Sequence, residues 1–487
     1  MKTSEYAAHD AVGIADLVRR GEVTAAEVRQ AALKAVAAVN PTLNAVVEVW
    51  ADEPMTAPEG SGTRAPLAGV PLLLKDLAIT AKGRRNELGS RLGAGMTAAE
   101  DTELMRRFRA AGLTPIGRTS TPEMAISTTT EPLATGATRN PWDVTRSAGG
   151  SSGGAGAAVA SGCVPVAHAT DGGGSIRVPA ACTGVFGLKP TRGRVSNGPG
   201  VDEVWSGLAV QFALSRSVRD SAVLLDAVHG ASIGEPYEIA APERPYLEEV
   251  GRDPGPIRIA LVRHPLNGRG SNPAMVAAVD EVAGLCERLG HHVEEVLPDI
   301  GVSWEGFVHA NAQFWATNTA AWLDAVAGLV GRTPDRDILE PATFAVAEYG
   351  RRASALELLG ALDVRNTVTR RMGTLLSRFD VLLSPTLAEL PLPIGAYNRP
   401  QTEVDGLGWI AHVFDRSPFT AVANVAGLPA MSVPLSVDPE SGLPIGSQFV
   451  AGFGREDLLF RLAGQLERAA PWAGRRPPIW AGAGMDS

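Results

Sequence analysis

Two stretches decide the fold: GGSSGG at residues 149–154 and TDGGGSIR at residues 170–177. They place Ser151 and Ser175 in loops crowded with glycine. A glycine-rich loop lets the backbone approach a small molecule closely and aim several N–H groups at one point. Such groups suit a bound anion or the oxyanion of a tetrahedral intermediate. The second stretch therefore predicts an oxyanion hole together with a serine nucleophile, Ser175.

Lys75 is the candidate base, because a serine hydroxyl is a weak nucleophile until a base removes its proton. Residues 69–75 read GVPLLLK, a short apolar run that ends in a cation. This pattern predicts a buried strand whose last side chain enters a dry site. Burial lowers the pKa of a lysine, since desolvation disfavours the charged form, and a neutral amine accepts a proton. Local sequence alone favours an ion pair between Lys75 and Asp76 at the strand end, and the catalytic interpretation depends on the combination of Lys75 with the two serine stretches.

Lys75 and the two glycine-rich stretches together resemble the amidase signature family of serine hydrolases. The similarity continues from residue 149 to residue 191, and it is weaker at residues 117–123 (GRTSTPE) and 424–429 (NVAGLP). The resemblance implies an α/β fold with a single large domain. It further implies a central mixed β-sheet covered by helices on both faces, and a helical N-terminal arm.

The resemblance also implies a Ser-Ser-Lys triad, in which Ser175 attacks the amide carbonyl, Ser151 relays the proton and Lys75 is the base. A cis peptide bond is implied between Gly150 and Ser151. Four backbone N–H groups would form the oxyanion hole, namely those of Gly172, Gly173, Gly174 and Ser175. Four further residues are expected to support the loops by hydrogen bonding: Ser152, Thr170, Asp171 and Arg177.

Within the family, the GGG form of the nucleophile loop and residues 189–196 (KPTRGRVS) look most like the bacterial subgroup that opens cyclic amides, the 6-aminohexanoate cyclic dimer hydrolases. The expected substrate is therefore a small apolar or cyclic amide. The first alternative is the glutaminase subunit of a tRNA-dependent amidotransferase, which shares the triad. That subunit usually has an acidic Ser-Leu-Asp-Gln stretch where this chain has GLAVQ at residues 207–211. An inactive binding module is a further alternative, although all three triad positions are filled.

The first stretch also fits the G-x-S-x-G pattern of the nucleophile elbow in α/β-hydrolase-type esterases. Histidines follow downstream, as that fold requires: His229, His264, His291, His292, His309 and His412. An elbow needs a strand that runs directly into the serine, whereas residues 140–147 (NPWDVTRS) predict a polar loop broken by proline. His168 is a tempting partner for Ser175, but a lone histidine on the apolar strand 164–169 is more typical of a packed core residue.

The composition predicts a soluble cytoplasmic enzyme that needs no cofactor and no metal. The chain has 44 Lys and Arg against 53 Asp and Glu, a net charge of −9, and it has no basic run that could follow a nucleic acid. Three cysteines without paired spacing argue for a reducing compartment: Cys163, Cys182 and Cys286. The sequence shows no secretion signal, membrane span, P-loop, dinucleotide fingerprint or zinc motif. The expected partner is a small-molecule amide, and a homodimer is compatible with the sequence.

Residues 1–60 predict a helical arm and connector, and residues 61–480 the catalytic domain. Its core motif covers residues 69–191, and its variable substrate-binding region covers about 200–420. Aromatic residues concentrate in the variable region, and four of them fall near one stripe of a predicted helix: Trp304, Phe307, Phe314 and Trp315. Core packing explains such a stripe, and the functional alternative is an apolar wall beside a narrow polar catalytic slot.

The second half of the chain predicts further α/β elements. Residues 257–262 predict a strand, 273–289 a helix and 292–296 another strand, which together suggest a βαβ unit. A final helix is predicted over residues 456–469.

Overall fold

The computed structural model describes residues 1–53, 65–201 and 203–483. Within these residues, 11 strands form one mixed sheet in the order β1-β3-β2-β4-β6-β5-β10-β11-β9-β7-β8. The strands are β1 (Val46–Val49), β2 (Pro71–Lys75), β3 (Thr114–Thr119), β4 (Val166–Asp171), β5 (Phe186–Lys189), β6 (Val210–Ser215), β7 (Arg258–Leu261), β8 (His292–Glu295), β9 (Val381–Pro385), β10 (Ala430–Val437) and β11 (Pro444–Ala451). β2 runs parallel to β3 and β4, whereas β10 runs antiparallel to β5 and β11. The predicted α/β fold with a central mixed sheet is confirmed.

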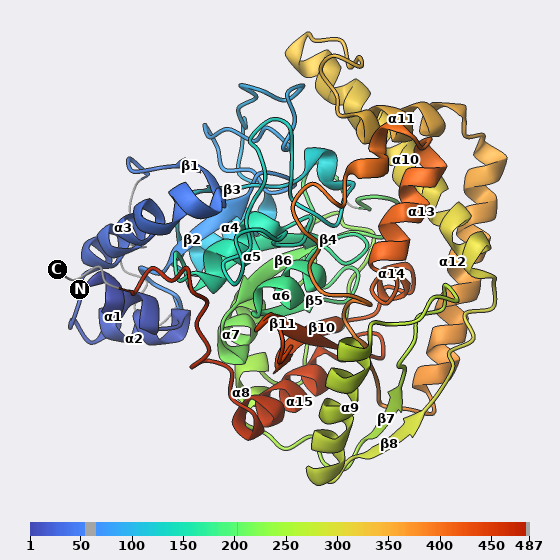
Figure 1. Cartoon of the computed structure of the whole chain (residues 1–487). Coiled ribbons are helices and arrows are strands. Elements are labelled where there is room, and N and C mark those ends of the chain that lie inside the picture. The colour runs from blue at the N-terminus through green and yellow to red at the C-terminus, as the bar shows by residue number, and fades with distance from the viewer. Residues whose placement is uncertain (54–64, 202, 484–487) are drawn as a thin grey trace.

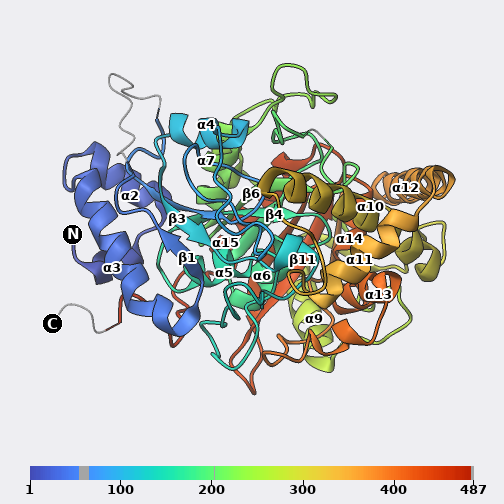
Figure 2. The ribbon, with the colours of Figure 1, turned by 90° about the horizontal axis from the view of Figure 1, so that it is seen from above.

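Helices cover both faces of this sheet, as predicted. α5 packs on α6 along one face, while α7 packs on α4 and α15 along the other (Figure 2). The helices are α1 (Thr3–Ala8), α2 (Ala11–Arg19), α3 (Ala25–Leu43), α4 (Glu103–Ala110), α5 (Gly153–Ala160), α6 (Arg177–Thr183), α7 (Val218–Val228), α8 (Tyr246–Val250), α9 (Pro273–Arg288), α10 (Trp304–Val330), α11 (Pro341–Arg352), α12 (Ala355–Leu376), α13 (Gly406–Arg416), α14 (Ala421–Val425) and α15 (Glu456–Ala469).

The N-terminal arm is helical and is part of the main core. Thr24 and Glu27 form a capping box at the start of α3, since the Glu27 N–H donates to Thr24 Oγ1 at 3.2 Å and the Thr24 N–H donates to Glu27 Oε2 at 2.8 Å. Ile14 and Val28 are fully buried in the same apolar cluster as strands β2 and β4. β1 then joins the sheet edge beside β3. The predicted connector lies mostly outside the described residues, as does the boundary between residues 60 and 61.

The predicted βαβ unit is confirmed as β7, α9 and β8, because β7 and β8 pair in parallel. The final helix α15 also has its predicted bounds. Beyond this unit, helices α10 to α13 gather at the end of the molecule opposite α1 to α3 (Figure 1). They enclose a second apolar cluster that contains Phe307, Trp315 and Phe414.

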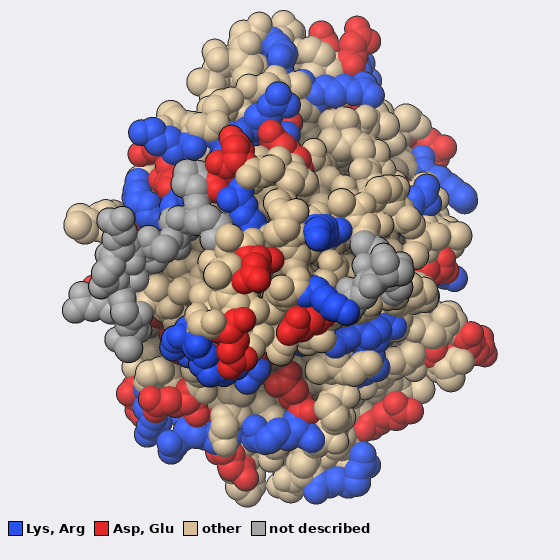
Figure 3. All heavy atoms as spheres, turned by 90° about the vertical axis from the view of Figure 1, so that its left-hand side faces the viewer, with Lys and Arg blue, Asp and Glu red and all other residues tan. Residues whose placement is uncertain are grey.

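The surface in Figure 3 mixes charges of both signs. Lys and Arg alternate with Asp and Glu on this face, and neither sign forms a continuous patch. Among the described residues, no helix combines the length and apolarity needed to cross a membrane.

Candidate active site

Lys75, Ser151 and Thr170 meet at one edge of the sheet. Lys75 is the last residue of β2, and Thr170 lies at the end of the neighbouring parallel strand β4. The carboxyl ends of parallel strands meet at the same edge, where open α/β sheets place their ligands. Lys75 Nζ donates to Ser151 Oγ at 2.7 Å and to Thr170 Oγ1 at 2.8 Å. The structure therefore brings together two of the three predicted triad residues.

The GGSSGG loop approaches this edge from the start of α5. The Gly150–Ser151 peptide bond is cis, as the family resemblance implied. A Cβ on Gly150 would lie 2.5 Å from the carbonyl oxygen of Thr129, so a larger residue does not fit there. Ser152 Oγ donates to the carbonyl oxygen of Thr170 and accepts from its N–H, both at 3.3 Å. These two bonds join the first serine loop to the end of β4.

The side chain of Lys75 is fully buried, and desolvation lowers its pKa well below the usual value, although the negative charge of Asp171 partly opposes the shift. The alternative ion pair with Asp76 is wrong. Asp76 instead accepts from Arg118 Nη1 at 2.7 Å and from the Glu87 N–H at 2.7 Å. Lys75 thus has hydroxyl partners and is placed to be a neutral amine.

His168 is a packed core residue, as predicted. Its ring is fully buried and packs edge-on against Phe108. Nδ1 accepts the backbone N–H of Lys75 at 3.3 Å, so Nε2 holds the proton and donates it to Gln211 Oε1 at 3.2 Å. Burial is the main cause that lowers the pKa of His168 to about 3, and Lys75, when protonated, would lower it further. The neutral imidazole fixes the end of β2.

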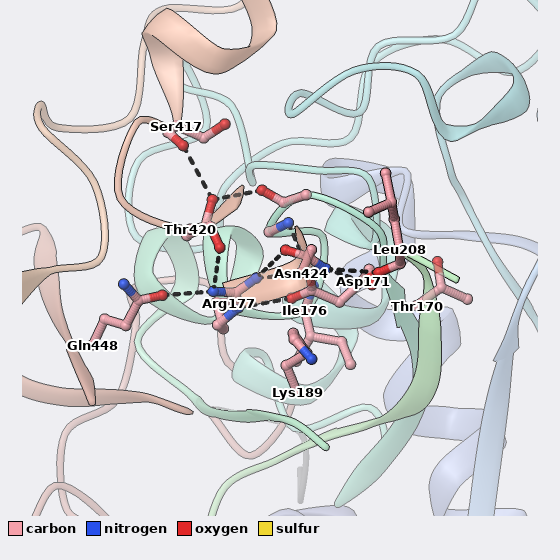
Figure 4. Close-up of polar contacts among 12 residues, drawn as sticks. Thr170, Asp171, Ile176, Arg177, Lys189, Leu208, Ser417, Thr420, Asn424 and Gln448 are labelled. Atoms are coloured by element: carbon pink, nitrogen blue, oxygen red, sulfur yellow. Dashed lines mark hydrogen bonds and ion pairs between the residues drawn. The ribbon is translucent and has the colours of Figure 1, made fainter. Parts of the chain in front are cut away.

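Asp171 shapes the second serine loop. Its carboxylate accepts from the N–H groups of Gly174 at 2.8 Å and Ile176 at 3.2 Å, and from Arg177 Nε and Nη2, both at 2.9 Å (Figure 4). Burial would raise the pKa of Asp171, but the charge and hydrogen bonds of Arg177 outweigh it, and the pKa falls to about 2. Asp171 and Arg177 are thus a fully buried ion pair that closes the loop around Ser175.

Ser175 lies at the tip of this loop, immediately before α6. Its side chain is 5% exposed, and its hydroxyl has no hydrogen-bond partner in the described part of the chain. Of the four predicted oxyanion donors, the Gly174 N–H is already bonded to Asp171 Oδ1 and is not free for a ligand. No turn, loop or side-chain bond within the described ranges engages the N–H groups of Gly172, Gly173 or Ser175. Three of the four predicted donors therefore remain available.

Residues far along the chain support the same loop, and the sequence analysis assigned none of them a role. The carbonyl oxygen of Thr420 accepts from Arg177 Nη1 at 2.8 Å, and Thr420 Oγ1 donates to the carbonyl oxygen of Gly173 at 2.6 Å. Asn424 Nδ2 donates to Asp171 Oδ1 at 2.8 Å, and Gln448 Oε1 accepts from Arg177 Nη1 at 2.7 Å (Figure 4). The similarity at residues 424–429 was the available signal, and it indicated Asn424 but neither Thr420 nor Gln448.

Between β3 and α5 the described chain contains no strand that leads into Ser151, so the nucleophile elbow of an α/β-hydrolase is not formed. Among the residues that the structure describes, no three His, Cys, Asp or Glu side chains are grouped as metal ligands.

Comparisons with known proteins find similarity along nearly the whole chain. The Amidase family model matches residues 27–460. The 6-aminohexanoate-cyclic-dimer hydrolase of Paenarthrobacter ureafaciens is 37% identical over 480 residues, which cover 96% of each chain. A solved structure of 6-aminohexanoate cyclic dimer hydrolase superposes with a TM-score of 0.90 at 36% identity, and covers 97% of this chain and 99% of its own.

A subunit of the glutamyl-tRNA(Gln) amidotransferase of Thermotoga maritima is less similar. Its structure has a TM-score of 0.73 at 27% identity and covers 93% of this chain and 94% of its own. The fold and the full-length similarities define an enzyme that hydrolyses carbon–nitrogen bonds of amides. The chain belongs to the amidase signature family. The amidotransferase alternative is not favoured.

Proposed function

We propose that this enzyme hydrolyses small apolar or cyclic amides through an acyl-enzyme on Ser175. The main support is the 2.7 Å contact between Lys75 Nζ and Ser151 Oγ in a fully buried site. A second support is the similarity along the whole chain to a hydrolase named for a cyclic dimer substrate. A related structure of that hydrolase is described as complexed with substrate, which fits a small-molecule amide.

Lys75 is the base in the proposed reaction. A neutral amine has a lone pair and two N–H groups, so Nζ can accept the Ser151 proton while it donates to Thr170. Ser151 then accepts the proton of Ser175, and Ser175 Oγ forms a bond to the amide carbon. The C–N bond breaks as the proton returns from Lys75 through Ser151 to the leaving nitrogen. Water then forms a bond to the acyl carbon and gives its proton through Ser151 to Lys75. The proton returns through Ser151 to Ser175 Oγ as the ester C–O bond breaks and the acid leaves.

The N–H groups of Gly172, Gly173 and Ser175 are the proposed oxyanion donors, because they lack other partners in the described chain. Loss of one such donor typically lowers the rate by roughly 100- to 1,000-fold. Four side chains would affect the reaction indirectly, because they hold the two serine loops in place by the hydrogen bonds given above: Ser152, Thr170, Asp171 and Arg177. The Gly174 N–H stabilises the nucleophile loop by its hydrogen bond to Asp171 Oδ1.

A small cavity lies beside the first serine loop, and its lining includes none of Lys75, Ser151 and Ser175. It has a volume of about 40 Å³, and its lining includes Gly149, Val178, Leu387 and Leu390. Glu389 and Arg416 also line it, and they pair with each other at 2.7 Å. Four other polar side chains belong to the lining, so the cavity is of mixed character: Thr128, Thr129, Ser147 and Tyr397.

We also propose residues 61–480 as the catalytic domain, with the region from about 200 to 420 selecting the substrate. Its helices α10 to α13 enclose the apolar cluster next to the nucleophile loop. The three cysteines are buried and unpaired, which fits the predicted reducing cytoplasm.

Product detection by mass spectrometry tests the proposal with a panel of linear primary amides, aryl amides, cyclic amides and glutamine. The wild type should open cyclic amides, and Ser175→Ala should lose this activity while it keeps the wild-type circular dichroism. The control is Ser377→Ala, an exposed serine at the end of α12, which should retain full activity. Turnover of glutamine alone would overturn the substrate class, and activity in Ser175→Ala would overturn the triad.

A further inference from the structure

The glycines of the nucleophile loop are packed so closely that larger residues do not fit. A Cβ on Gly173 would lie 2.8 Å from Cζ2 of Trp315, and a Cβ on Gly174 would lie 2.5 Å from Oγ1 of Thr420. Gly174 also has a φ angle of 139°, which other residues rarely adopt. Glycine leaves the backbone freer to rotate than any other residue does. The loop therefore depends on its surroundings to keep its N–H groups in one orientation.

The Thr420 hydroxyl supplies part of this support. It donates to the carbonyl oxygen of Gly173 at 2.6 Å, and that oxygen has no other partner in the described part of the chain. The carbonyl oxygen of Ser417 is also within reach of the hydroxyl, at 3.1 Å, but it accepts the backbone N–H of Thr420 as well (Figure 4). A hydroxyl has one proton. The shorter distance and the lack of another partner both assign this proton to Gly173.

One peptide unit of the loop is thus held at both ends. The carbonyl oxygen of Gly173 and the N–H of Gly174 belong to the same planar unit and point to opposite sides of the chain. The oxygen accepts from Thr420, and the N–H donates to Asp171 Oδ1 at 2.8 Å, so the two bonds together oppose rotation of the unit. The flanking peptide units carry the N–H groups of Gly173 and Ser175, two of the three proposed oxyanion donors. Their orientation depends on the unit that is held between them.

We propose that the Thr420 hydroxyl is a positioning group for the oxyanion hole. Donors stabilise an oxyanion only if they lie about 2.7–3.1 Å from the place where it forms. The side chain of Thr420 is 0% exposed, so water cannot replace its hydroxyl, and without it the buried Gly173 carbonyl would lose its partner. The peptide unit would then be free to turn, and the neighbouring N–H groups would turn with it. Thr420 thus acts on the transition state through Gly173 and Ser175. This inference rests on the proposed function, whose catalytic machinery it extends.

Amide hydrolysis by Thr420→Val tests this role. The substitution removes the hydroxyl but keeps the shape of the side chain and the backbone carbonyl that binds Arg177. It should lower kcat by about 10- to 100-fold at an unchanged KM, since a displacement of about 1 Å can cost 100-fold and a contact made in the transition state leaves substrate binding unaffected. Thr420→Ser, which keeps a hydroxyl, should retain most of the wild-type kcat.

The matched control is Thr183→Val at the far end of α6. Thr183 is also 0% exposed, and its Oγ1 donates to the carbonyl oxygen of Pro179 at 2.6 Å, so the substitution removes the same kind of bond from an equally buried place. It should keep the wild-type kcat. Thr420→Ala and Thr420→Ser differ only in the hydroxyl, so their comparison tests the role even if valine disturbs the folding.

Inhibition by a trifluoromethyl ketone tests the oxyanion hole without turnover. Ser175 Oγ forms a bond to the ketone carbon, its proton passes through Ser151 to Lys75, and the ketone oxygen becomes an oxyanion. Thr420→Val should weaken this inhibition by the same factor as kcat. Equal inhibition of wild type and Thr420→Val, equal kcat in Thr420→Ser and Thr420→Ala, or an equal loss of kcat in Thr183→Val would overturn the inference. Failure of the wild type to hydrolyse amides would instead overturn the proposed function, and the ketone would still test Thr420.

Discussion

Asp171→Asn should destabilise the fold and the nucleophile loop together. The substitution keeps the shape of the side chain but removes its charge, and it leaves the Arg177 guanidinium buried without a counter-charge. Both side chains of the pair are 0% exposed, so water cannot replace the lost partner. An asparagine also has an NH₂ group in place of one acceptor oxygen, and it cannot accept all the bonds from Gly174, Ile176 and Arg177.

The expected loss of stability follows from the burial of the Asp171–Arg177 pair and from the pKa of Asp171. A pKa lowered from 3.8 to about 2 means that the folded state favours the ionised carboxylate by about 2 kcal/mol. Removal of one partner from a buried pair costs more, about 3–5 kcal/mol, because the remaining charge stays uncompensated. The stabilisation from Asp171 is complete above pH 3.8 and is lost as the pH falls toward 2. The difference between wild type and variant should therefore shrink in that acid range.

Urea unfolding followed by tryptophan fluorescence at neutral pH measures this loss. The control is Asp324→Asn, because Asp324 is 60% exposed and its 2.7 Å pair with Arg351 lies at the surface. It should lose less than about 1 kcal/mol. A loss below about 1 kcal/mol in Asp171→Asn would refute the role given to the buried pair. So would a loss of equal size in both variants.

Two further predictions concern the base and the loop. Turnover should fall as the pH decreases through the lowered pKa of Lys75, because a protonated amine cannot accept the Ser151 proton, and a kcat profile with no acid limb down to the pH at which the protein unfolds would exclude Lys75 as the base. Gly173→Ala should lower both kcat and the melting temperature, at a cost of about 1–3 kcal/mol, since its Cβ would lie 2.8 Å from Trp315 Cζ2. Gly328→Ala on α10 is the control, because no atom lies within 4 Å of its Cβ and alanine favours a helix. Wild-type melting and kcat in Gly173→Ala would contradict the close packing.

The sequence predicts the parts of the site that depend on short stretches. The buried strand 71–75 follows from its apolar run, and the lowered pKa of Lys75 follows from its position at the strand end. The two serine loops follow from their glycines and from the family resemblance. Local propensity is informative here because each of these elements forms within a few residues.

The missed residues are those that only the tertiary fold brings to the site. Thr420 lies beside α14 and Gln448 lies on β11, both remote in sequence from Asp171. Nothing in their neighbouring residues indicates a buried arginine as a partner, whereas the similarity at residues 424–429 indicated Asn424 without its role. The orientation of the Gly174 N–H was likewise unpredictable, because it depends on where the Asp171 carboxylate turns. Contacts between side chains that are far apart in the sequence depend on how the elements pack, and a local sequence pattern does not predict that packing.

The site needs an ionised Asp171 close to a neutral Lys75, and the network around Asp171 explains how both can exist. An unpaired carboxylate would favour protonated Lys75, and the charge of Asp171 does raise the pKa of that lysine. Arg177 compensates this charge, while Asn424 and two backbone N–H groups solvate it. Desolvation is then the largest influence on the pKa of Lys75, and it lowers that pKa. The same residues that hold the loop of Ser175 thus keep the proposed base able to accept a proton, so Asp171→Asn should also move the acid limb of the kcat profile to lower pH.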